Sequence, residues 1–274
     1  MLGSVITFFG VGGGTYYYAH EIEPASLQIT KEMITSYRIP ASFNHFKIVQ
    51  FSDTHIGFQY SFSQLEKLVK TINDQKPDLI VFTGDLIDEP QTFQSSQQLI
   101  KVLQQLHAKH GKFWIYGNHD HGGYGTDMVN DIMNQAEFQL LKNSHKNIEL
   151  GNEGITLVGV DDLILGSPDL KAALANSDEE KFTILLAHEP DYADIARKYF
   201  VDVQLSGHSH GGQVRLPLIG HLYTPIYAEK YVQGKYELNN KDFSLYVNRG
   251  IGTTRLPFRF LCKPEIHVFT LHSK

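Results

Sequence analysis

The sequence predicts an α/β fold, and three observations lead to this prediction. From about residue 45, short apolar runs alternate with longer segments in which apolar residues recur at helical spacing. Glycine and proline residues punctuate the boundaries between these segments. The chain has 274 residues, of which 42% are hydrophobic, so it can bury a core in one domain or a slightly elaborated one.

The apolar runs are expected to form buried strands, with helices covering the faces of the sheet. In chain order, these strands are predicted at residues 47–52, 78–83, 113–116, 155–160, 183–187 and 203–205. After Gly211 the helical pattern fades, and further strands are predicted at residues 232–238, 244–248 and 266–271. An edge strand is expected at residues 27–30. The late run of strands favours mixed rather than purely parallel pairing.

Two helices are predicted between the first strands. The first is expected to begin at Ser63, which forms a capping box with Glu66, and to end before Pro77. Its apolar stripe consists of Leu65, Leu68, Val69 and Ile72. The second helix is stopped by Gly111, and its stripe consists of Leu99, Val102, Leu103 and Leu106.

The N-terminal part of the chain divides into an apolar segment and a connection. Residues 1–19 carry no charged side chain, and their length is close to the roughly 20 residues that span a bilayer. The tyrosines at 16–18 suit a membrane interface. We therefore expect a membrane anchor or a signal-like segment, although five glycines leave open a Gly-rich leader packed on the domain. Residues 20–44 would then connect this segment to a domain at residues 45–274.

Composition narrows the classes of function. The formal net charge is -6 and no basic stripe is visible, so a specific nucleic-acid partner is not expected. Cys262 is the one cysteine, which excludes an internal disulfide and a cysteine-based metal site. The chain has 14 histidines, a high number for this length, and several of them follow predicted strands.

A polar group that could bind metal follows each of five predicted strands. In chain order, these groups are Asp53-x-His55, Gly84-Asp85, Gly117-Asn118-His119-Asp120, His188 and Gly207-His208-Ser209-His210. The carboxyl ends of strands line the ligand crevice in open α/β sheets. We therefore expect these scattered residues to converge at one place.

The residue types at these strand ends suit two metal ions. Two divalent ions carry four positive charges, of which Asp53 and Asp85 would neutralise two, so the centre would stay positive and attract phosphate. Mixed imidazole and oxygen ligands favour Mn, Fe or Zn over Ca or Mg. If one carboxylate bridges the ions, seven candidate ligands suffice: Asp53, His55, Asp85, Asn118, His188, His208 and His210.

The five blocks, in this order, resemble the signature of the calcineurin-like metallophosphoesterases. The later segments GGQVRLP at 211–217, NRG at 248–250 and PE at 264–265 resemble a bacterial branch of membrane-associated phosphoesterases. The resemblance covers about residues 45 to 272. It implies a four-layer αββα sandwich with mixed sheets and a dinuclear site at one end of the sheets.

The resemblance also implies a role for each residue of the site. One metal ion would be held by Asp53, His55, Asp85 and His210. The other would be held by Asp85, Asn118, His188 and His208, so that Asp85 bridges the two. A hydroxide between the ions would attack phosphorus in line. His119 would protonate the leaving group or stabilise its charge, and Asp120 would orient His119.

The resemblance implies a metal-dependent hydrolase of a phosphoester. The expected substrate is a phosphodiester or a pyrophosphate, of a lipid or cell-envelope metabolite, and a phosphomonoesterase is the alternative. A non-catalytic scaffold of this fold would be expected to lack ligands, and a nuclease to have a basic groove. The apolar N-terminus leads us to expect membrane association with the domain outside the cytoplasm, and a cytoplasmic location is the alternative.

Other polar residues near the motifs have structural interpretations. Asp88 is expected to be a cap or an acceptor behind the ligands rather than a ligand itself. Asp161 and Asp162 are expected to form a turn, although both follow a strand and could face the site. His121 is equally suited to lining the pocket and to packing elsewhere.

Three arginines near the C-terminus are candidates for contact with a substrate phosphate, because guanidinium groups bind phosphate through two hydrogen bonds. They are Arg249, Arg255 and Arg259. A structural role in the turn at residues 248–252 is the favoured interpretation.

Overall fold

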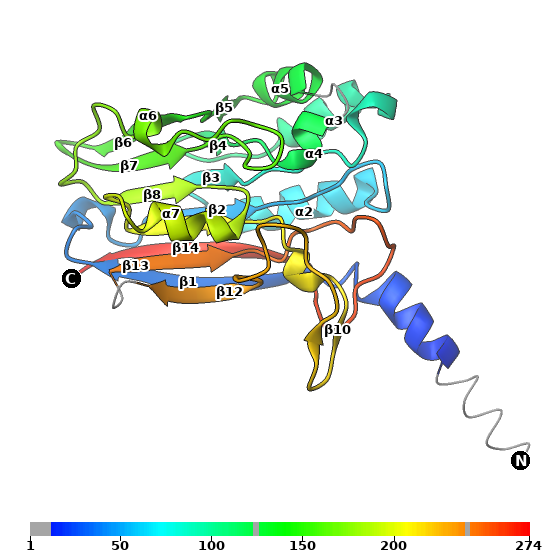
Figure 1. Ribbon diagram of the computed structural model, residues 1–274. Helices are drawn as coiled ribbons and strands as arrows, with labels where there is room; N and C mark the ends of the chain where they lie inside the picture. Colours follow the sequence, from blue (N-terminus) through cyan, green and yellow to red (C-terminus); the bar gives the residue numbers. More distant parts are fainter. Residues whose placement is uncertain (1–11, 123–125, 239–241) are drawn as a thin grey trace, which may run out of the picture.

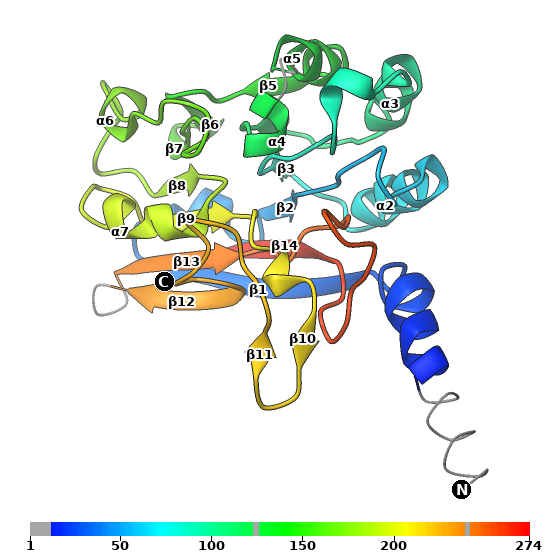
Figure 2. The same ribbon diagram turned by 45° about the vertical axis from the view of Figure 1, so that its right-hand side comes forward.

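The architecture is a four-layer sandwich in a computed structural model that describes residues 12–122, 126–238 and 242–274. Within these residues, two six-stranded sheets lie against each other, and helices cover the outer face of each (Figure 1). The same layering is visible after a turn of the view (Figure 2). The predicted α/β fold with mixed sheets and αββα layers is confirmed.

The first sheet is mostly parallel. Its strands pair in the order β1 (Gln28–Ser36), β14 (Glu265–Ser273), β2 (Lys47–Phe51), β3 (Leu79–Phe82), β4 (Lys112–Trp114) and β5 (Phe138–Leu140). Antiparallel pairing occurs between β14 and β2. Since β2, β3 and β4 run in the same direction, their carboxyl ends meet at one edge of the sheet.

The second sheet has a parallel centre and antiparallel margins. Its order is β12 (Gly234–Leu238), β13 (Phe243–Val247), β9 (Val203–Ser206), β8 (Thr183–Leu186), β7 (Glu153–Gly159) and β6 (Ser144–Leu150). The pairs β12–β13 and β6–β7 are antiparallel, whereas β13, β9, β8 and β7 run parallel. The ends of β8 and β9 therefore also share one edge.

Three apolar clusters hold the four layers together. The central cluster lies between the sheets and joins residues such as Val81 of β3 to Leu205 of β9. An outer cluster packs the first sheet on α2 (Phe62–Asp74), α3 (Ser96–Leu103) and α5 (Thr126–Gln135). The other outer cluster packs the second sheet on α6 (Leu170–Ala173) and α7 (Ala193–Ala196). Sheets with helices on both outer faces bury both sides of their strands, which explains the continuous apolar runs.

Several elements differ from the sequence-based expectation. Helix α2 begins at Phe62, directly after its N-cap residue Ser61. Ser61 forms the capping box with Gln64, whereas the predicted box paired Ser63 with Glu66. Its stripe is buried as predicted. Strand β1 is longer than the expected edge strand at residues 27–30. Helix α5 and strands β5 and β6 were not predicted.

The N-terminal part of the chain leaves the sandwich as a helix (Figure 2). Residues 12–17 are helical, and the π-helix η1 (Tyr18–Ile22) continues them. The first eleven residues of the predicted apolar segment lie outside the described residues. Among the residues described, none of the helices has the length and apolar character to cross a membrane.

A small hairpin, β10 (Arg215–Leu216) with β11 (Gly220–His221), extends from the body of the molecule after the fifth sequence motif (Figure 2). Short 3-10 helices occur in the connections between the other elements: η2 (Ala41–Phe43), η3 (Pro90–Thr92), η5 (Pro190–Tyr192) and η6 (His210–Gly212).

Candidate metal centre

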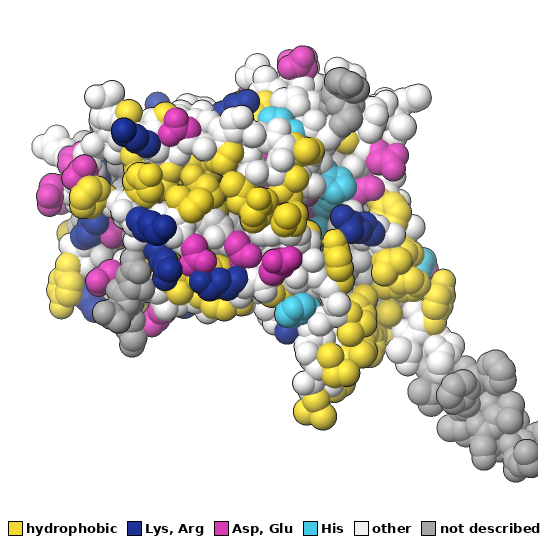
Figure 3. Space-filling model, viewed as in Figure 1, with side chains coloured by type: hydrophobic (Ala, Val, Ile, Leu, Met, Phe, Trp, Pro, Cys, Tyr) yellow, Lys and Arg dark blue, Asp and Glu magenta, His cyan; other side chains and the backbone are white. Residues whose placement is uncertain are grey.

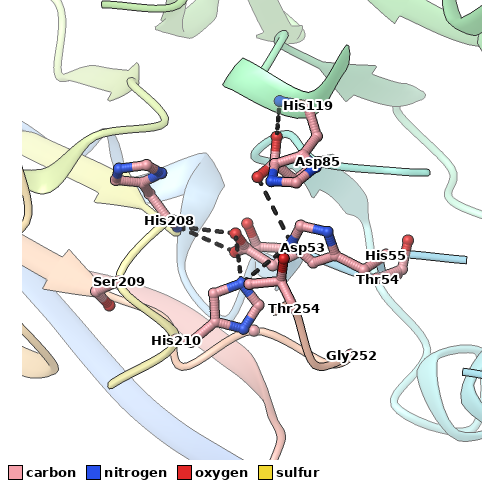
Figure 4. A network of polar contacts seen from close by, with 12 residues as sticks. Asp53, Thr54, His55, Asp85, His119, His208, Ser209, His210, Gly252 and Thr254 are labelled. Carbon is pink, nitrogen blue, oxygen red and sulfur yellow. Dashed lines mark hydrogen bonds and ion pairs between the residues drawn. The ribbon is translucent and has the colours of Figure 1, made fainter. Parts of the chain in front are cut away.

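The ends of five strands bring the seven predicted ligands to one edge of the sandwich. Asp53 and His55 follow β2, Asp85 follows β3, and Asn118 begins α4 (Asn118–His121) after β4. His188 follows β8, and the segment from His208 to His210 follows β9. Both sheets thus contribute to one site. Figure 4 shows histidine side chains from both sheets arranged around Asp53 and Asp85.

The first group of ligand atoms consists of Asp53, His55 and His210. The Nε2 atoms of His55 and His210 lie 3.0 Å apart, and Nε2 of His210 lies 3.6 Å from Oδ1 of Asp53. One ligand atom from each of the three residues falls within 4.8 Å of the others. This spacing suits a shared cation.

The second group consists of Asp85, His188 and His208, again with ligand atoms within 4.8 Å of one another. Nε2 of His188 lies 3.3 Å from Oδ2 of Asp85 and 3.2 Å from Nδ1 of His208. The same oxygen, Oδ2 of Asp85, lies 3.6 Å from Nε2 of His55 in the first group. Asp85 is therefore placed between the two groups, where a bridging carboxylate would stand.

Asn118 provides a direct test of whether these residues fit a metal ion. Its Oδ1 atom is buried and has no hydrogen-bond partner among the described residues. Leaving a buried acceptor unpaired costs about 1–3 kcal/mol. Asn118 lines the same cavity as Asp85 and His208, and a cation bound by Oδ1 would satisfy this atom. The donor set, which combines imidazole nitrogens with carboxylate and amide oxygens, is one that transition metals accept.

The backbone of the site is unusual in a way that points to function. Five of the seven predicted ligands adopt a left-handed backbone with positive φ: Asp53 at 52°, His55 at 43°, Asp85 at 62°, His208 at 66° and His210 at 49°. Non-glycine residues rarely adopt this conformation, and such strain clusters at active sites and ligand clamps. The fold thus stabilises a costly geometry that aims these side chains inward.

Two glycines of the motifs are required by close approach. A Cβ atom on Gly207 would lie 2.0 Å from Oγ of Ser52 and 2.4 Å from Oδ2 of Asp53. On Gly117 it would lie 2.3 Å from Oδ1 of Asp85. In both motifs the glycine lets the backbone pass directly against a carboxylate of the site.

Burial sets the protonation of the histidines. Burial, together with neighbouring His188, lowers the pKa of His208 to about 3. Burial, together with His55 and Arg259, lowers the pKa of His210 well below its usual range. Both imidazoles are therefore neutral near pH 7, which is the form that binds metal ions. Burial raises the pKa of Asp53, a cost that a nearby divalent cation would reverse.

Asp85 carries the negative charge of the site. Burial by itself would raise the pKa of this carboxyl, but His188 and His119 lower it well below its usual range. Its Oδ1 atom accepts a hydrogen bond from the backbone N–H of His119, at 2.9 Å. This bond ties the bridging position to the residue that is expected to act as the acid.

His119 lies at the mouth of the site, and its ring is held by Asp88. Nδ1 of His119 lies 2.7 Å from the carbonyl oxygen of Asp88. Burial by itself would lower the pKa of His119, but Asp85 and Asp88 raise it above its usual range. Oδ1 of Asp88 also lies 2.9 Å from Nδ1 of His55. Asp88 therefore supports two histidines from behind, in keeping with the expectation that it is not itself a ligand.

The role expected for Asp120 requires correction. Its carboxylate accepts hydrogen bonds from the backbone N–H groups of Asp85, Leu86 and Gly117, at 2.8 to 2.9 Å. Asp120 thus clamps the loops after β3 and β4 together, and the carbonyl of Asp88 is the group that orients His119. Burial and the nearby Asp85 raise the pKa of Asp120 to about 6.

Several other candidates are not among the grouped ligand atoms, although Nη2 of Arg259 lies 3.4 Å from Nδ1 of His210. Nε2 of His121 lies 2.7 Å from Oδ1 of Asp161, away from the cavity. Asp162 accepts hydrogen bonds from the backbone N–H groups of Ile164 and Leu165, which lie in the bend that follows the two acids. Arg249 pairs with Glu265, and the buried Arg259 donates to the carbonyl oxygens of Gly252, Cys262 and Arg249. Of the three arginines, Arg255 alone lines the cavity.

A cavity of about 340 Å³ opens beside the predicted ligands. Its floor consists of Asp85, Asn118, His119, His208 and His210. Its outer wall is apolar and was missed by the sequence analysis: Val214, Leu222, Tyr223, Pro225 and Leu256. These residues lie in loops with no periodic pattern, so nothing in the sequence marks them as neighbours of the motifs.

Comparisons with known proteins agree with this geometry. The sequence model of the family described as Calcineurin-like phosphoesterase matches residues 46–212. The chain is 46% identical over 274 residues to the uncharacterised metallophosphoesterase YkuE of Bacillus subtilis, which spans all of this chain and 95% of that protein. It is 28% identical to the phosphodiesterase YaeI of Escherichia coli, covering 93% of this chain and 92% of the relative.

A further relative is the UDP-2,3-diacylglucosamine pyrophosphatase LpxG of Chlamydia muridarum, at 27% identity, covering 92% of this chain and 91% of that protein. Among solved structures, a dimetal phosphatase from Danio rerio superposes with a TM-score of 0.51 at 13% identity. The match covers 76% of this chain and 88% of that one, and it supports the fold.

Proposed function

Because the chain belongs to the calcineurin-like phosphoesterase family, we propose that it is a phosphoester hydrolase with two divalent metal ions. The observation that carries the proposal is the position of Asp85. Its Oδ2 atom lies 3.3 Å from His188 of one ligand group and 3.6 Å from His55 of the other. A single carboxylate oxygen between two groups of metal-competent atoms is the arrangement that a dinuclear centre needs.

Each residue would then contribute in a specific way. Asp53, His55 and His210 would hold one ion, and Asn118, His188 and His208 the other, with Asp85 shared between them. Divalent ions here would supply positive charge for the developing negative charge on phosphorus and would lower the pKa of bound water. The metal could be Mn, Zn or Fe, because the ligand set mixes nitrogen and oxygen.

His119 is suited to protonating the leaving group. Its Nδ1 atom is engaged by the carbonyl oxygen of Asp88 at 2.7 Å, and a carbonyl oxygen can only accept, so Nδ1 carries the hydrogen. The remaining nitrogen, Nε2, is thereby left for the substrate, and His119 is one of the residues that line the cavity. A proton held at Nε2 could pass to the leaving oxygen.

The shape of the cavity favours a phosphodiester or a pyrophosphate that carries an apolar group. Leu222, Tyr223 and Leu256 form an apolar wall beside the polar floor. Arg255 stands at the same wall and could pair with a second phosphate or a carboxylate. Two relatives have names that state an activity: one is a phosphodiesterase and the other a UDP-2,3-diacylglucosamine pyrophosphatase. A lipid or cell-envelope metabolite is therefore the proposed substrate class, with membrane association as the proposed location.

A comparison of two chromogenic substrates tests this function. Purified protein loaded with Mn²⁺ is expected to hydrolyse bis(p-nitrophenyl) phosphate faster than p-nitrophenyl phosphate, and His119→Ala is expected to lose most of the rate. A preference for the monoester would establish the phosphomonoesterase alternative. Absence of turnover of both substrates, with two ions bound, would indicate a non-catalytic scaffold.

A further inference from the structure

An exposed apolar surface lies next to the cavity, and the proposed function does not account for it. It is built from three segments of the chain: the β10–β11 hairpin with the residues after it, the loop at residues 254–261, and the N-terminal helix. Its members include Leu218, Ile219, Leu222, Tyr223, Leu256 and Tyr16, each more than half exposed. Figure 3 shows hydrophobic side chains gathered over the hairpin and the region toward the N-terminal helix. We call these six residues the apolar rim.

Direct contacts make the apolar rim continuous. The backbone N–H of Arg215 in β10 donates to the carbonyl oxygen of Phe260, which joins the hairpin to the loop. The ring of Phe258 lies 5.3 Å from that of Tyr16, which joins the loop to the N-terminal helix. The three segments therefore form one surface and not three separate patches.

The tip of the hairpin has a strained backbone and exposes large apolar side chains to water, and both features cost free energy. Leu218 adopts a left-handed backbone with φ of 67°, where glycine or asparagine would fit with less strain, and its side chain is fully exposed. Ile219 beside it is 71% exposed. Large apolar side chains on a strained, protruding turn contribute little to the folded domain by themselves. A partner that covers them would account for the cost.

The charge of this region identifies the kind of partner. Residues 214–228 and 251–264 contain no aspartate or glutamate, although the whole chain has a net charge of -6. Within the same segments stand Arg215, Arg255 and Lys263. The hairpin segment and the loop therefore combine exposed apolar side chains with basic and no acidic residues, which complements a bilayer with anionic headgroups, whereas the N-terminal helix carries the exposed Glu21.

We propose that the apolar rim docks the domain on an anionic lipid bilayer, with Leu218 and Ile219 entering the interface. The hairpin that carries Leu218 and Ile219 protrudes from the body of the molecule (Figure 2). The rim is also continuous with the N-terminal helix, beyond which the chain has eleven uncharged residues. Tyr16, Tyr17 and Tyr223 are aromatic residues of the type that sit at headgroup level.

This docking would present the metal centre to the membrane. Leu222 and Tyr223 belong to the rim and also line the cavity, so one wall of the cavity would face the lipid. A substrate with an acyl or alkyl chain could then reach the polar floor without leaving the interface. This consequence rests on the proposed function, whereas docking itself does not.

Docking is tested with an environment-sensitive fluorophore on the full-length protein. The label is placed at Ile219→Cys and, as a matched control, at Leu165→Cys, which is similarly exposed in the loop after β7; the native Cys262 is buried and does not compete. With vesicles of equimolar phosphatidylglycerol and phosphatidylcholine, the label at position 219 is expected to shift to shorter wavelength and that at 165 to stay unchanged. An unchanged spectrum at position 219 overturns the proposal, and self-association of the protein in that case would assign the rim to a second copy.

A second experiment separates docking from catalysis. The variant Leu218→Ser/Ile219→Ser is compared with wild type on soluble bis(p-nitrophenyl) phosphate and on a long-chain alkyl p-nitrophenyl phosphodiester in the same vesicles. We expect the rate on the embedded substrate, relative to the soluble one, to fall by about tenfold, since apolar area is lost from the interface. An unchanged ratio would overturn docking. If wild type hydrolyses neither substrate, the proposed function fails, while the fluorescence result still decides docking.

Discussion

The Nε2 atoms of His55 and His210 lie 3.0 Å apart in the interior, although 155 residues separate them in the sequence. The histidines contribute ligand atoms to a group that also contains Asp53. Burial and His55 both lower the pKa of His210, so the imidazole of His210 is neutral near pH 7. The fold therefore brings two imidazole nitrogens to a distance at which both could bind one cation.

Metal binding is accordingly expected to stabilise the protein. A ligand that binds the native state alone contributes about 2.7 kcal/mol per site at a free concentration of 100 times its Kd. Chelation of the wild type should lower its melting temperature by several degrees, and Mn²⁺ should restore it. The variant His55→Ala/His210→Ala should respond much less to either treatment. An equal response of the two proteins would contradict metal binding by this histidine pair.

His119 and His121 form a matched pair of neighbouring histidines with different surroundings. His119 lines the cavity, whereas His121 pairs with Asp161 outside it. We expect His119→Ala to lower kcat by about 10²- to 10⁴-fold, because a positioned acid contributes that much. Its metal content should stay unchanged, and His121→Ala should keep kcat within a few-fold of wild type. Equal losses in both variants would indicate a structural effect.

Asp88 is expected to control the metal affinity of His55. Its Oδ1 atom lies 2.9 Å from Nδ1 of that histidine, and partners of this kind fix the ring and the tautomer of a ligand. Asp88→Ala should weaken metal binding or activity by about 10- to 100-fold. The exposed neighbour Glu89→Ala is the control. Metal titrations measure the affinity of both variants. Equal metal affinities of Asp88→Ala and Glu89→Ala would contradict the proposed effect of Asp88 on His55.

The lowered pKa of Asp161 predicts that the contribution of this residue to the stability of the protein depends on pH. Burial opposes ionisation, but a hydrogen bond from His121 and the backbone N–H of Ser167 lower the pKa of Asp161 to about 2, from a usual value of 3.8. Its stabilising effect is thus complete above the usual value and is lost as the pH falls towards 2.

Asp161→Asn should therefore reduce the free energy of unfolding by about 1–3 kcal/mol at pH 7. The difference from wild type should shrink as the pH is lowered from about 4 towards 2. Urea denaturation at pH 7, 5 and 3 measures it. A difference that stays constant over this range would show that the ionised carboxylate is not the cause.

The convergence of the candidate ligands could be predicted from the sequence because their signal is local. Each candidate ligand follows directly after an apolar run, as Asp53 follows β2 and His188 follows β8, and strand ends converge in this class of fold. The first residue of helix α2 could not be predicted in the same way. Ser61–Gln64 and Ser63–Glu66 both match the capping pattern, and the structure uses the first pair.

The function of Asp120 and the apolar rim depended on tertiary structure. The resemblance implied that Asp120 orients His119, yet its carboxylate binds backbone N–H groups of the loop after β3. Leu222 and Leu256 reach the cavity from irregular loops. Strand β6 was overlooked because its residues show no strong apolar pattern: a single residue of β6, Ile148, is buried. Helix α5 does have an apolar stripe of Val129, Ile132 and Met133, which the sequence analysis did not use.

Metal stoichiometry tests the dinuclear centre most directly. Protein saturated with Mn²⁺ and freed of excess metal is analysed by inductively coupled plasma mass spectrometry, alongside His119→Ala and Asp85→Ala. Two ions per chain are expected for wild type and for His119→Ala, and a clear loss of both ions is expected for Asp85→Ala, whose Oδ2 atom faces both ligand groups. One ion or none in the saturated wild type, or two ions retained by Asp85→Ala, would contradict a centre bridged by this carboxylate.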